Sequence, residues 1–156
     1  MYNMTIQNHS PYDKDAANFK QPIKIESSKY DAEANRYLNL IKYSDDSLKQ
    51  LTGYFEKCKE PTIILFLGDH QPRLTDEFMN KITNGQYQTW NSEQMMKRYQ
   101  VPFVIWANYD IKEQHIEKTS MNYIQSILTK TAGVKMTGYQ SCLLYTSPSP
   151  RDMRRS

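Results

Sequence analysis

The most informative part of the chain is Phe66-Leu67-Gly68-Asp69-His70-Gln71-Pro72, at the end of an apolar run that begins at Ile63. A short apolar run between a proline and a glycine is typical of a strand buried in a parallel sheet. Ligands of open α/β sheets bind beyond the carboxyl ends of the strands, which is where Asp69 and His70 stand. A carboxylate oxygen beside an imidazole nitrogen makes half of a divalent metal site. The alternative is a polar turn after the strand, because two ligands alone do not complete a metal site.

Apolar spacing in the rest of the chain predicts a succession of helices and strands. Leucine, isoleucine and aromatic side chains recur at helical intervals between Ser28 and about Lys57, which is typical of one amphipathic helix. Ser28 followed by Asp31 resembles a capping box at the start of this helix. Further elements are expected as strands over residues 2–7 and 101–107 and as helices over 75–83, 92–99 and 118–131. This order predicts an α/β fold with a mainly parallel sheet flanked by helices.

Charge and composition exclude several classes of protein. The chain has 156 residues and a formal net charge of +3. Three arginines and one aspartate place +2 of this charge in the last sixteen residues, so no basic stripe for nucleic acid is expected elsewhere. Cys58 and Cys142 form no metal motif and suggest no disulfide framework. No apolar run reaches the roughly 18 residues of a membrane span, and no signal peptide is visible at Met1.

The composition changes at Ser141, after which the apolar periodicity ends and two prolines follow. Residues 141–156 resemble the translation of a sequencing adapter, and we expect them to form a disordered, artefactual tail. The functional part of the chain is therefore expected to be residues 1–140.

The three histidines of the chain differ in their surroundings. His9 lies in Gln-Asn-His-Ser-Pro-Tyr and follows an expected strand, as His70 does, so a sheet would gather both at one edge. The alternative for His9 is a turn histidine that caps a loop. His115 lies in a polar stretch and is interpreted as a surface residue, and the pair Asp45–Asp46 as part of a solvated helix face.

Four ordered segments resemble one known family. The segments are Thr5–Tyr12, Asn35–Leu48, Gly68–Pro72 and Val101–Asn108. Together they are similar to the C-terminal half of the extracellular domain of lipoteichoic acid synthase-like proteins. These are sulfatase-type members of the alkaline phosphatase superfamily. The resemblance covers about residues 1–140 and implies an alkaline phosphatase/sulfatase-like α/β fold that is truncated on its N-terminal side.

The resemblance also implies roles for individual residues. Asp69 and His70 match the metal-ligand pair of the family, whose ion is manganese or another divalent cation. His9 matches a histidine that contacts the phosphate-bearing substrate. The acidic metal ligand, the threonine nucleophile and the transmembrane helices of the family are all expected upstream of residue 1. The complete protein is therefore expected at the cell membrane, with this domain outside the cell.

The implied activity is phosphoglycerol transfer. A glycerol-phosphate group would move from a lipid-linked donor to the threonine and then to a cell-envelope polymer, and the present chain alone would be inactive. The alternatives are a sulfatase or a phosphoethanolamine-type transferase on the same fold, or a non-catalytic metal-binding fragment. The upstream nucleophile, a threonine or a modified cysteine, would distinguish the enzymes from one another.

Overall fold

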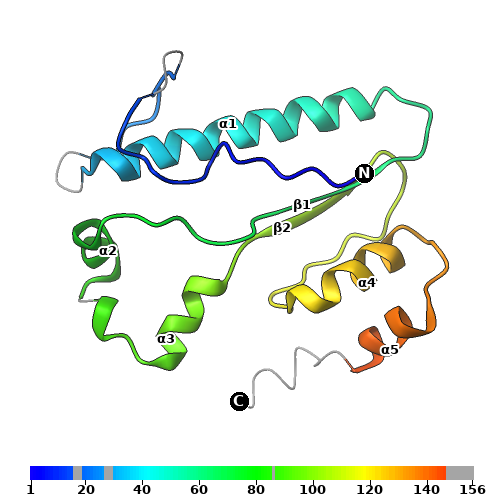
Figure 1. The fold of residues 1–156 in the computed structure, drawn as a ribbon. Coiled ribbons are helices and arrows are strands. Elements are labelled where there is room, and N and C mark those ends of the chain that lie inside the picture. Colours follow the sequence, from blue (N-terminus) through cyan, green and yellow to red (C-terminus); the bar gives the residue numbers. More distant parts are fainter. Residues whose placement is uncertain (16–18, 27–29, 86, 147–156) are drawn as a thin grey trace. The chain divides into compact units, whose positions relative to one another are not determined.

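The computed structural model describes residues 1–15, 19–26, 30–85 and 87–146 (Figure 1). The chain divides into two compact units. Unit 1 consists of residues 1–54 and 67–103, and unit 2 of residues 55–66 and 104–156. The expected site residues His9, Asp69 and His70 all belong to unit 1.

Helix α1, Ala32–Phe55, is the longest element of unit 1. Its first turn is capped by Asp31, whose Oδ1 accepts a hydrogen bond of 2.9 Å from the backbone N–H of Ala34. The other carboxylate oxygen of Asp31 accepts a bond of 2.7 Å from the hydroxyl of Thr75. Thr75 is itself the N-cap of the second helix, so one carboxylate joins the starts of two helices. The cap expected at Ser28 lies outside the described residues.

The remaining helices of unit 1 are short. Helix α2, Asp76–Thr83, ends at Asn84, whose φ of 54° is left-handed. The helix expected over residues 92–99 is divided into α3, Ser92–Met96, and the 3-10 helix η3, Lys97–Tyr99. A further 3-10 turn, η2, covers Tyr87–Thr89.

Two asparagines of α1 hold the extended segment 23–25 against the helix. Asn39 accepts a hydrogen bond of 3.0 Å from the Ile23 N–H and donates one of 2.9 Å to the Ile23 carbonyl. Asn35, one helical turn earlier, accepts a hydrogen bond of 2.9 Å from the Ile25 N–H. Both asparagines are buried, and their amides replace the partners that a neighbouring strand would supply.

The strand expected over residues 2–7 is not regular structure here. Within the described residues this segment forms no sheet ladder, and Tyr2, Met4 and Ile6 are exposed. A β-prone segment becomes a strand only where another strand supplies its hydrogen bonds. The segment instead leads into the turn at His9, and residues 8–12 lie along α1, as the dark blue trace in Figure 1 shows.

Strands β1, Ile63–Leu67, and β2, Phe103–Ala107, form a two-stranded sheet. The Gly68 N–H donates to the Pro102 carbonyl at 3.1 Å, and at the other end the Asn108 N–H donates to the Thr62 carbonyl at 3.1 Å. This pairing is antiparallel, which corrects the expectation of parallel strands for this pair. The physical reason is that the connection from β1 returns to the same end of the sheet, whereas a parallel crossover must return to the opposite end.

Asn108 fastens the beginning of β1 within unit 2. Its side-chain oxygen accepts a hydrogen bond of 2.7 Å from the Thr62 N–H. Its amide nitrogen donates to the carbonyl oxygens of Phe55, Cys58 and Glu60 at 2.9, 3.1 and 2.9 Å. The carbonyls left open after the last turn of α1 are thus satisfied by one side chain.

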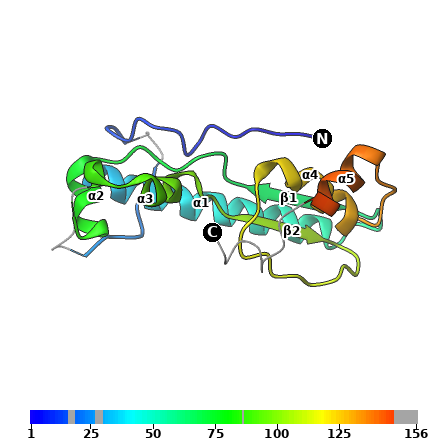
Figure 2. The same ribbon diagram turned by 90° about the horizontal axis from the view of Figure 1, so that it is seen from below.

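Helices α4, Met121–Thr131, and α5, Gly138–Thr146, pack together in unit 2 (Figure 2). Thr137 and Gln140 cap α5 reciprocally. The Thr137 hydroxyl oxygen accepts a hydrogen bond of 3.2 Å from the Gln140 N–H, and Oε1 of Gln140 accepts one of 2.9 Å from the Thr137 N–H. Residues 141–146, expected in the disordered tail, therefore belong to a helix with a defined start. Residues 147–156 lie outside the described residues. Among the described helices, none is long and apolar enough to cross a membrane.

Candidate functional site

The turn after β1 carries the predicted metal ligands and is fixed by backbone contacts. Gly68 closes the ladder with Pro102, and a Cβ atom at Gly68 would come within 3.3 Å of the Val101 side chain. A side chain at position 68 would therefore require the Val101 side chain to move by a few tenths of an ångström. The next residue, Asp69, accepts a hydrogen bond of 2.9 Å at Oδ1 from the His70 N–H.

The ring of His70 is oriented by the chain that follows it. Its Nδ1 lies 2.9 Å from the Gln71 carbonyl oxygen, and because a carbonyl can only accept, this nitrogen carries the hydrogen. The other nitrogen, Nε2, lies 3.7 Å from Oδ2 of Asp69. A ring that donates from one nitrogen to a carbonyl and leaves the other free is the usual state of a metal-ligating histidine.

Gln71 anchors this turn, and sequence reasoning did not single it out. Its side-chain amide donates to the carbonyl oxygens of Lys97 and Gln100 at 2.8 and 3.0 Å. Lys97 is the first residue of η3, and its carbonyl also accepts a hydrogen bond of 3.2 Å from the N–H of Gln100, the residue that ends η3. Gln71 thus ties the predicted metal turn to a helix end 26 residues further along the chain. The only sequence signal was its place directly after His70.

His9 lies on a turn in the first of the two segments that form unit 1, whereas Asp69 and His70 lie in the second. Its backbone N–H donates to the Ile6 carbonyl at 3.1 Å, and its Nδ1 lies 2.6 Å from the Ser10 carbonyl. As in His70, Nδ1 therefore carries the hydrogen and Nε2 is left open. The two imidazole rings are edge to face with centroids 5.8 Å apart. Folding thus brings His9 beside His70, which is 61 positions later in the chain and directly follows Asp69.

The residues on either side of His9 are held by α1. The side-chain amide of Asn8 donates to the Ser44 hydroxyl at 2.8 Å. The hydroxyl of Tyr12 donates to the Asn8 carbonyl at 2.7 Å, and Arg36 donates to the Tyr12 carbonyl at 2.9 Å. Burial raises the pKa of Tyr12 to about 12, with a smaller contribution from Tyr37. The turn that presents His9 is therefore anchored at both ends.

The donor set fits part of a divalent metal site. A carboxylate oxygen and an imidazole nitrogen 3.7 Å apart can both reach one ion, since each bond is about 2.0–2.2 Å long. Both side chains are exposed, so an ion could approach them. Within the described residues, however, no three His, Cys, Asp or Glu side chains form a group that could hold a metal. Asp69 and His70 would thus be two ligands of a larger set.

The other polar candidates lie at the surface, as expected. His115 is exposed, and Asp46 forms an ion pair with Lys42 one turn earlier on α1. Such pairs on a helix contribute little to stability or chemistry.

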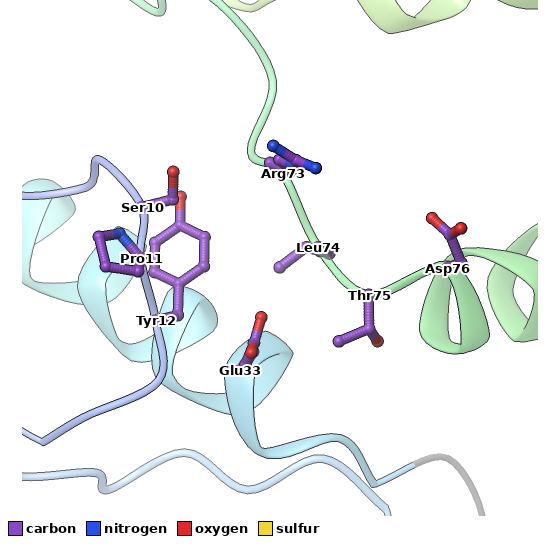
Figure 3. Close-up of a pocket in the computed structure, with 8 residues that line it drawn as sticks. All are labelled: Ser10, Pro11, Tyr12, Glu33, Arg73, Leu74, Thr75 and Asp76. Atoms are coloured by element: carbon purple, nitrogen blue, oxygen red, sulfur yellow. The ribbon is translucent and has the colours of Figure 1, made fainter.

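A cavity of about 510 Å³ lies beside the His9 turn, entirely within unit 1. In Figure 3, residues 10–12 form one side and residues 73–76 the other, with Glu33 of α1 between them. Its lining residues are Ser10, Pro11, Tyr12, Glu33, Arg73, Leu74, Thr75 and Asp76. Sequence reasoning missed this cavity because its walls come from three separate segments.

Comparison with known proteins identifies the family. The family model described as Sulfatase matches residues 1–134 of the chain. The chain belongs to the sulfatase family. Among curated members, it is 28% identical over 148 residues to a Rhizobium meliloti protein provisionally named as a cyclic beta-1,2-glucan modification protein. It is 30% identical over 83 residues to the phosphoethanolamine transferase EptA of Helicobacter pylori.

A solved sulfatase-like structure has the same fold. The phosphoglycerol transferase GacH of Streptococcus pyogenes, in complex with sn-glycerol-1-phosphate, superposes with a TM-score of 0.62 at 17% identity. The match covers 95% of this chain and 38% of GacH. It confirms the expected alkaline phosphatase/sulfatase-like fold, in which the described sheet is small and antiparallel.

The chain spans only part of these relatives. The alignment with the Rhizobium protein covers 90% of this chain and 23% of that protein. The alignment with EptA covers 52% of this chain and 15% of EptA. Two of these relatives are named as transferases, which supports the expectation that the chain comes from a family of enzymes.

Proposed function

We propose that the complete protein is a metal-dependent transferase that moves a phosphoglycerol-type head group from a lipid-linked donor to a cell-envelope polymer. The observation that carries this proposal is the convergence of His9 with Asp69 and His70 in one unit of a sulfatase-family chain, with the two histidine rings 5.8 Å apart. Convergent ionisable side chains at the end of a strand are the usual setting of an active site in this fold class.

Asp69 and His70 would hold the divalent cation, with Mn²⁺ as the expected ion. Asp69 contributes negative charge through Oδ2, and His70 contributes a neutral nitrogen through Nε2, because its Nδ1 is bound to Gln71. When bound, the ion would supply Lewis-acid stabilisation of charge on the phosphoryl oxygens. The remaining acidic ligand and the threonine nucleophile are proposed to lie in a part of the protein upstream of this chain.

His9 would contact the substrate head group through Nε2. Because Nδ1 donates to the Ser10 carbonyl, a neutral ring accepts a hydrogen bond at Nε2, for example from a glycerol hydroxyl. Only the doubly protonated ring donates from Nε2 to a phosphoryl oxygen. A neutral His9 ring would therefore contact the head group as a hydrogen-bond acceptor at Nε2.

The same proposal places the complete protein at the cell membrane with this domain outside the cell. A lipid-linked donor lies in the membrane, and a cell-envelope acceptor lies outside it. The present chain alone is expected to be inactive, because the proposal assigns it two of the metal ligands and assigns the nucleophile to the upstream part of the protein.

Phosphoethanolamine transfer is the second candidate, favoured by the 30% identity to EptA. A sulfatase on the same fold is the third. Lipid donors with glycerol, ethanolamine or choline head groups, together with an aryl sulfate, would separate these reactions in the complete protein. The preferred donor identifies the reaction, and turnover of the aryl sulfate alone would contradict the transferase proposal.

The experiment that tests the metal site uses the complete protein loaded with Mn²⁺. Asp69→Asn and His70→Ala should each lower metal affinity by more than the roughly 10–100-fold that changes beyond the ligands cause. His9→Ala should retain the metal and lose turnover. Asp45→Asn and His115→Ala replace exposed residues of the same types and serve as controls.

Elemental analysis and transfer assays on the five variants separate the roles. If His9→Ala empties the site while His70→Ala leaves it full, the two histidines have the opposite roles. If no variant changes the metal content, Asp69 and His70 form only a polar turn.

A further inference from the structure

The turn that carries the two expected metal ligands is fastened at both ends to residues 97–102 of the same unit. At its beginning, the Gly68 N–H donates to the Pro102 carbonyl at 3.1 Å. At its end, the side-chain amide of Gln71 donates to two carbonyl oxygens of this segment at 2.8 and 3.0 Å. The first contact continues the backbone ladder of the sheet, whereas the second depends on a single side chain. The position of the far end of the turn therefore depends on Gln71.

Gln71 also supplies the partner that orients the His70 ring. The Gln71 carbonyl oxygen lies 2.9 Å from Nδ1 of His70, so this nitrogen carries the hydrogen and Nε2 keeps its lone pair. Pro72 follows Gln71 and restricts its backbone to extended conformations, which limits the directions in which this carbonyl can point. The carbonyl that binds the ring is thus held by the proline on one side and by the Gln71 side chain on the other.

These contacts matter because the turn is open to solvent. The side chains of His70 and Asp69 are 59% and 75% exposed, so packing restrains their orientation little. Which nitrogen of a neutral imidazole carries the hydrogen is then set by the hydrogen bond that the ring makes. If the carbonyl were not fixed, the His70 ring would divide between two tautomers. Only one of them leaves Nε2, the nitrogen 3.7 Å from the Asp69 carboxylate, free to bind an ion.

We propose that Gln71 is a positioning residue of the metal site. Its side chain, bound to the segment 97–100, keeps the His70 ring in the tautomer and orientation that can bind a divalent cation. The inference rests on the proposed function, in which Asp69 and His70 are ligands, and adds a residue that contacts neither the ion nor the substrate. Because all of these contacts are made between protein groups, the ligand geometry is set before an ion binds.

The tautomer of His70 tests this role in the present chain without any metal. Nitrogen-15 spectra of the labelled protein, recorded at a pH where the ring is neutral, distinguish a protonated ring nitrogen from an unprotonated one. The unaltered protein should show His70 with its hydrogen on Nδ1. Gln71→Met keeps the length of the side chain and removes both of its hydrogen bonds, so the His70 signals should move towards those of a mixture of tautomers. The exposed His115 is the internal reference and should not change.

Gln94→Met is the matched control variant. Gln94 is also exposed and belongs to unit 1, and its side chain accepts a hydrogen bond of 3.0 Å from the Asn91 N–H in the cap of α3. This change removes a side-chain hydrogen bond as Gln71→Met does, but it should leave the His70 tautomer as it is. Unchanged His70 signals in Gln71→Met, or equal changes in both variants, would overturn the proposal.

The metal affinity of the complete protein separates this inference from the function on which it rests. Mn²⁺ binding, followed by electron paramagnetic resonance, should weaken about ten-fold in Gln71→Met, the lower end of the range for groups that orient metal ligands. It should stay constant in Gln94→Met. If Mn²⁺ binds equally well to all three proteins, Gln71 does not position a ligand, and Asp69 and His70 are judged by their own variants. If the unaltered protein binds no Mn²⁺, the proposed metal site fails, and the tautomer alone decides whether Gln71 orients His70.

Discussion

The hydroxyl of Tyr12 donates a hydrogen bond of 2.7 Å to the backbone carbonyl of Asn8 and so closes a loop around His9. The Tyr12 side chain is 3% exposed, so water competes little for this bond. Asn8 in turn is fixed to α1 through Ser44. The conformation of the His9 turn therefore depends on a residue that need not touch the substrate.

Replacing Tyr12 by phenylalanine removes this hydrogen bond and keeps the ring. We expect Tyr12→Phe to lower the free energy of unfolding by about 0.5–1.5 kcal/mol, the usual value for one intramolecular hydrogen bond. Urea denaturation measures this change, and the His9 ring resonances should shift as the turn loosens. Tyr30→Phe is the control, because Tyr30 is 52% exposed and should show neither effect. Equal stability of both variants would show that the Tyr12 bond is not important for the turn.

Stability should also fall at alkaline pH through Tyr12. Its pKa is raised from 10.0 to about 12, so the folded protein favours the neutral phenol that can donate to Asn8. The contribution of Tyr12 is therefore complete below pH 10 and is lost as the pH rises towards 12. Urea midpoints measured across this interval should decline more steeply in the unaltered protein than in Tyr12→Phe. Parallel curves would argue against a raised pKa at this residue.

Adding a methyl group at Gly68 should disturb the turn that holds Asp69 and His70. The new Cβ atom would lie 3.3 Å from Cβ of Val101, which is closer than ordinary packing allows. We expect Gly68→Ala to destabilise the protein by about 1–3 kcal/mol, as overpacking does elsewhere. Thermal or urea denaturation provides the measurement.

Two further variants show whether the contact with Val101 causes this loss. In Gly68→Ala combined with Val101→Ala, the two effects should be less than additive because the second change makes room for the first. Gly53→Ala should instead stabilise the protein, since Gly53 lies inside α1 and an added Cβ would meet no neighbouring atom within 4 Å. A gain of about 0.5–1 kcal/mol is expected there. Strict additivity of the double variant would point to a cause other than the contact.

Truncating Asn39 should release the segment 23–25 from α1. Asn39→Ala removes the partners of both the N–H and the carbonyl of Ile23, which are half-buried. We expect a loss of about 1 kcal/mol, the usual net value of an intramolecular hydrogen bond. Hydrogen exchange of the Ile23 amide should accelerate more than that of amides in the middle of α1. Asn122→Ala changes an exposed asparagine of α4 and should have no such effect. Unchanged exchange at Ile23 would mean that the segment is held by other contacts.

Local sequence signals were sufficient for α1, α2 and α4 but not for α5, most of which lies in the stretch expected to be a disordered tail. Thr75 followed by two acidic residues marked the start of α2, and apolar spacing marked α1 and α4. The direction of the second strand could not be predicted in the same way. It depends on where a connection of more than thirty residues returns to the sheet, and no short pattern encodes that path.

The candidate site was predictable to the same limited extent. Asp69 and His70 stood out because polar residues at a strand end carry chemistry in α/β folds. Gln71 and Arg73 did not, because their importance depends on carbonyl groups or cavity walls that only folding brings near. His9 was noticed by its position after a β-prone segment, although that segment turned out not to be a strand.

The carboxylate shared by the starts of α1 and α2 has a consequence for how the family can vary. Asp31 and Thr75 are 44 positions apart in sequence but form one hydrogen-bonded pair, so a change at either position leaves the other without its partner. Among related sequences the two positions are therefore expected to change together, with Asp or Asn at 31 accompanied by Thr or Ser at 75. Relatives that lose one of the pair should have lost the other, and should begin both helices with a different pair of caps.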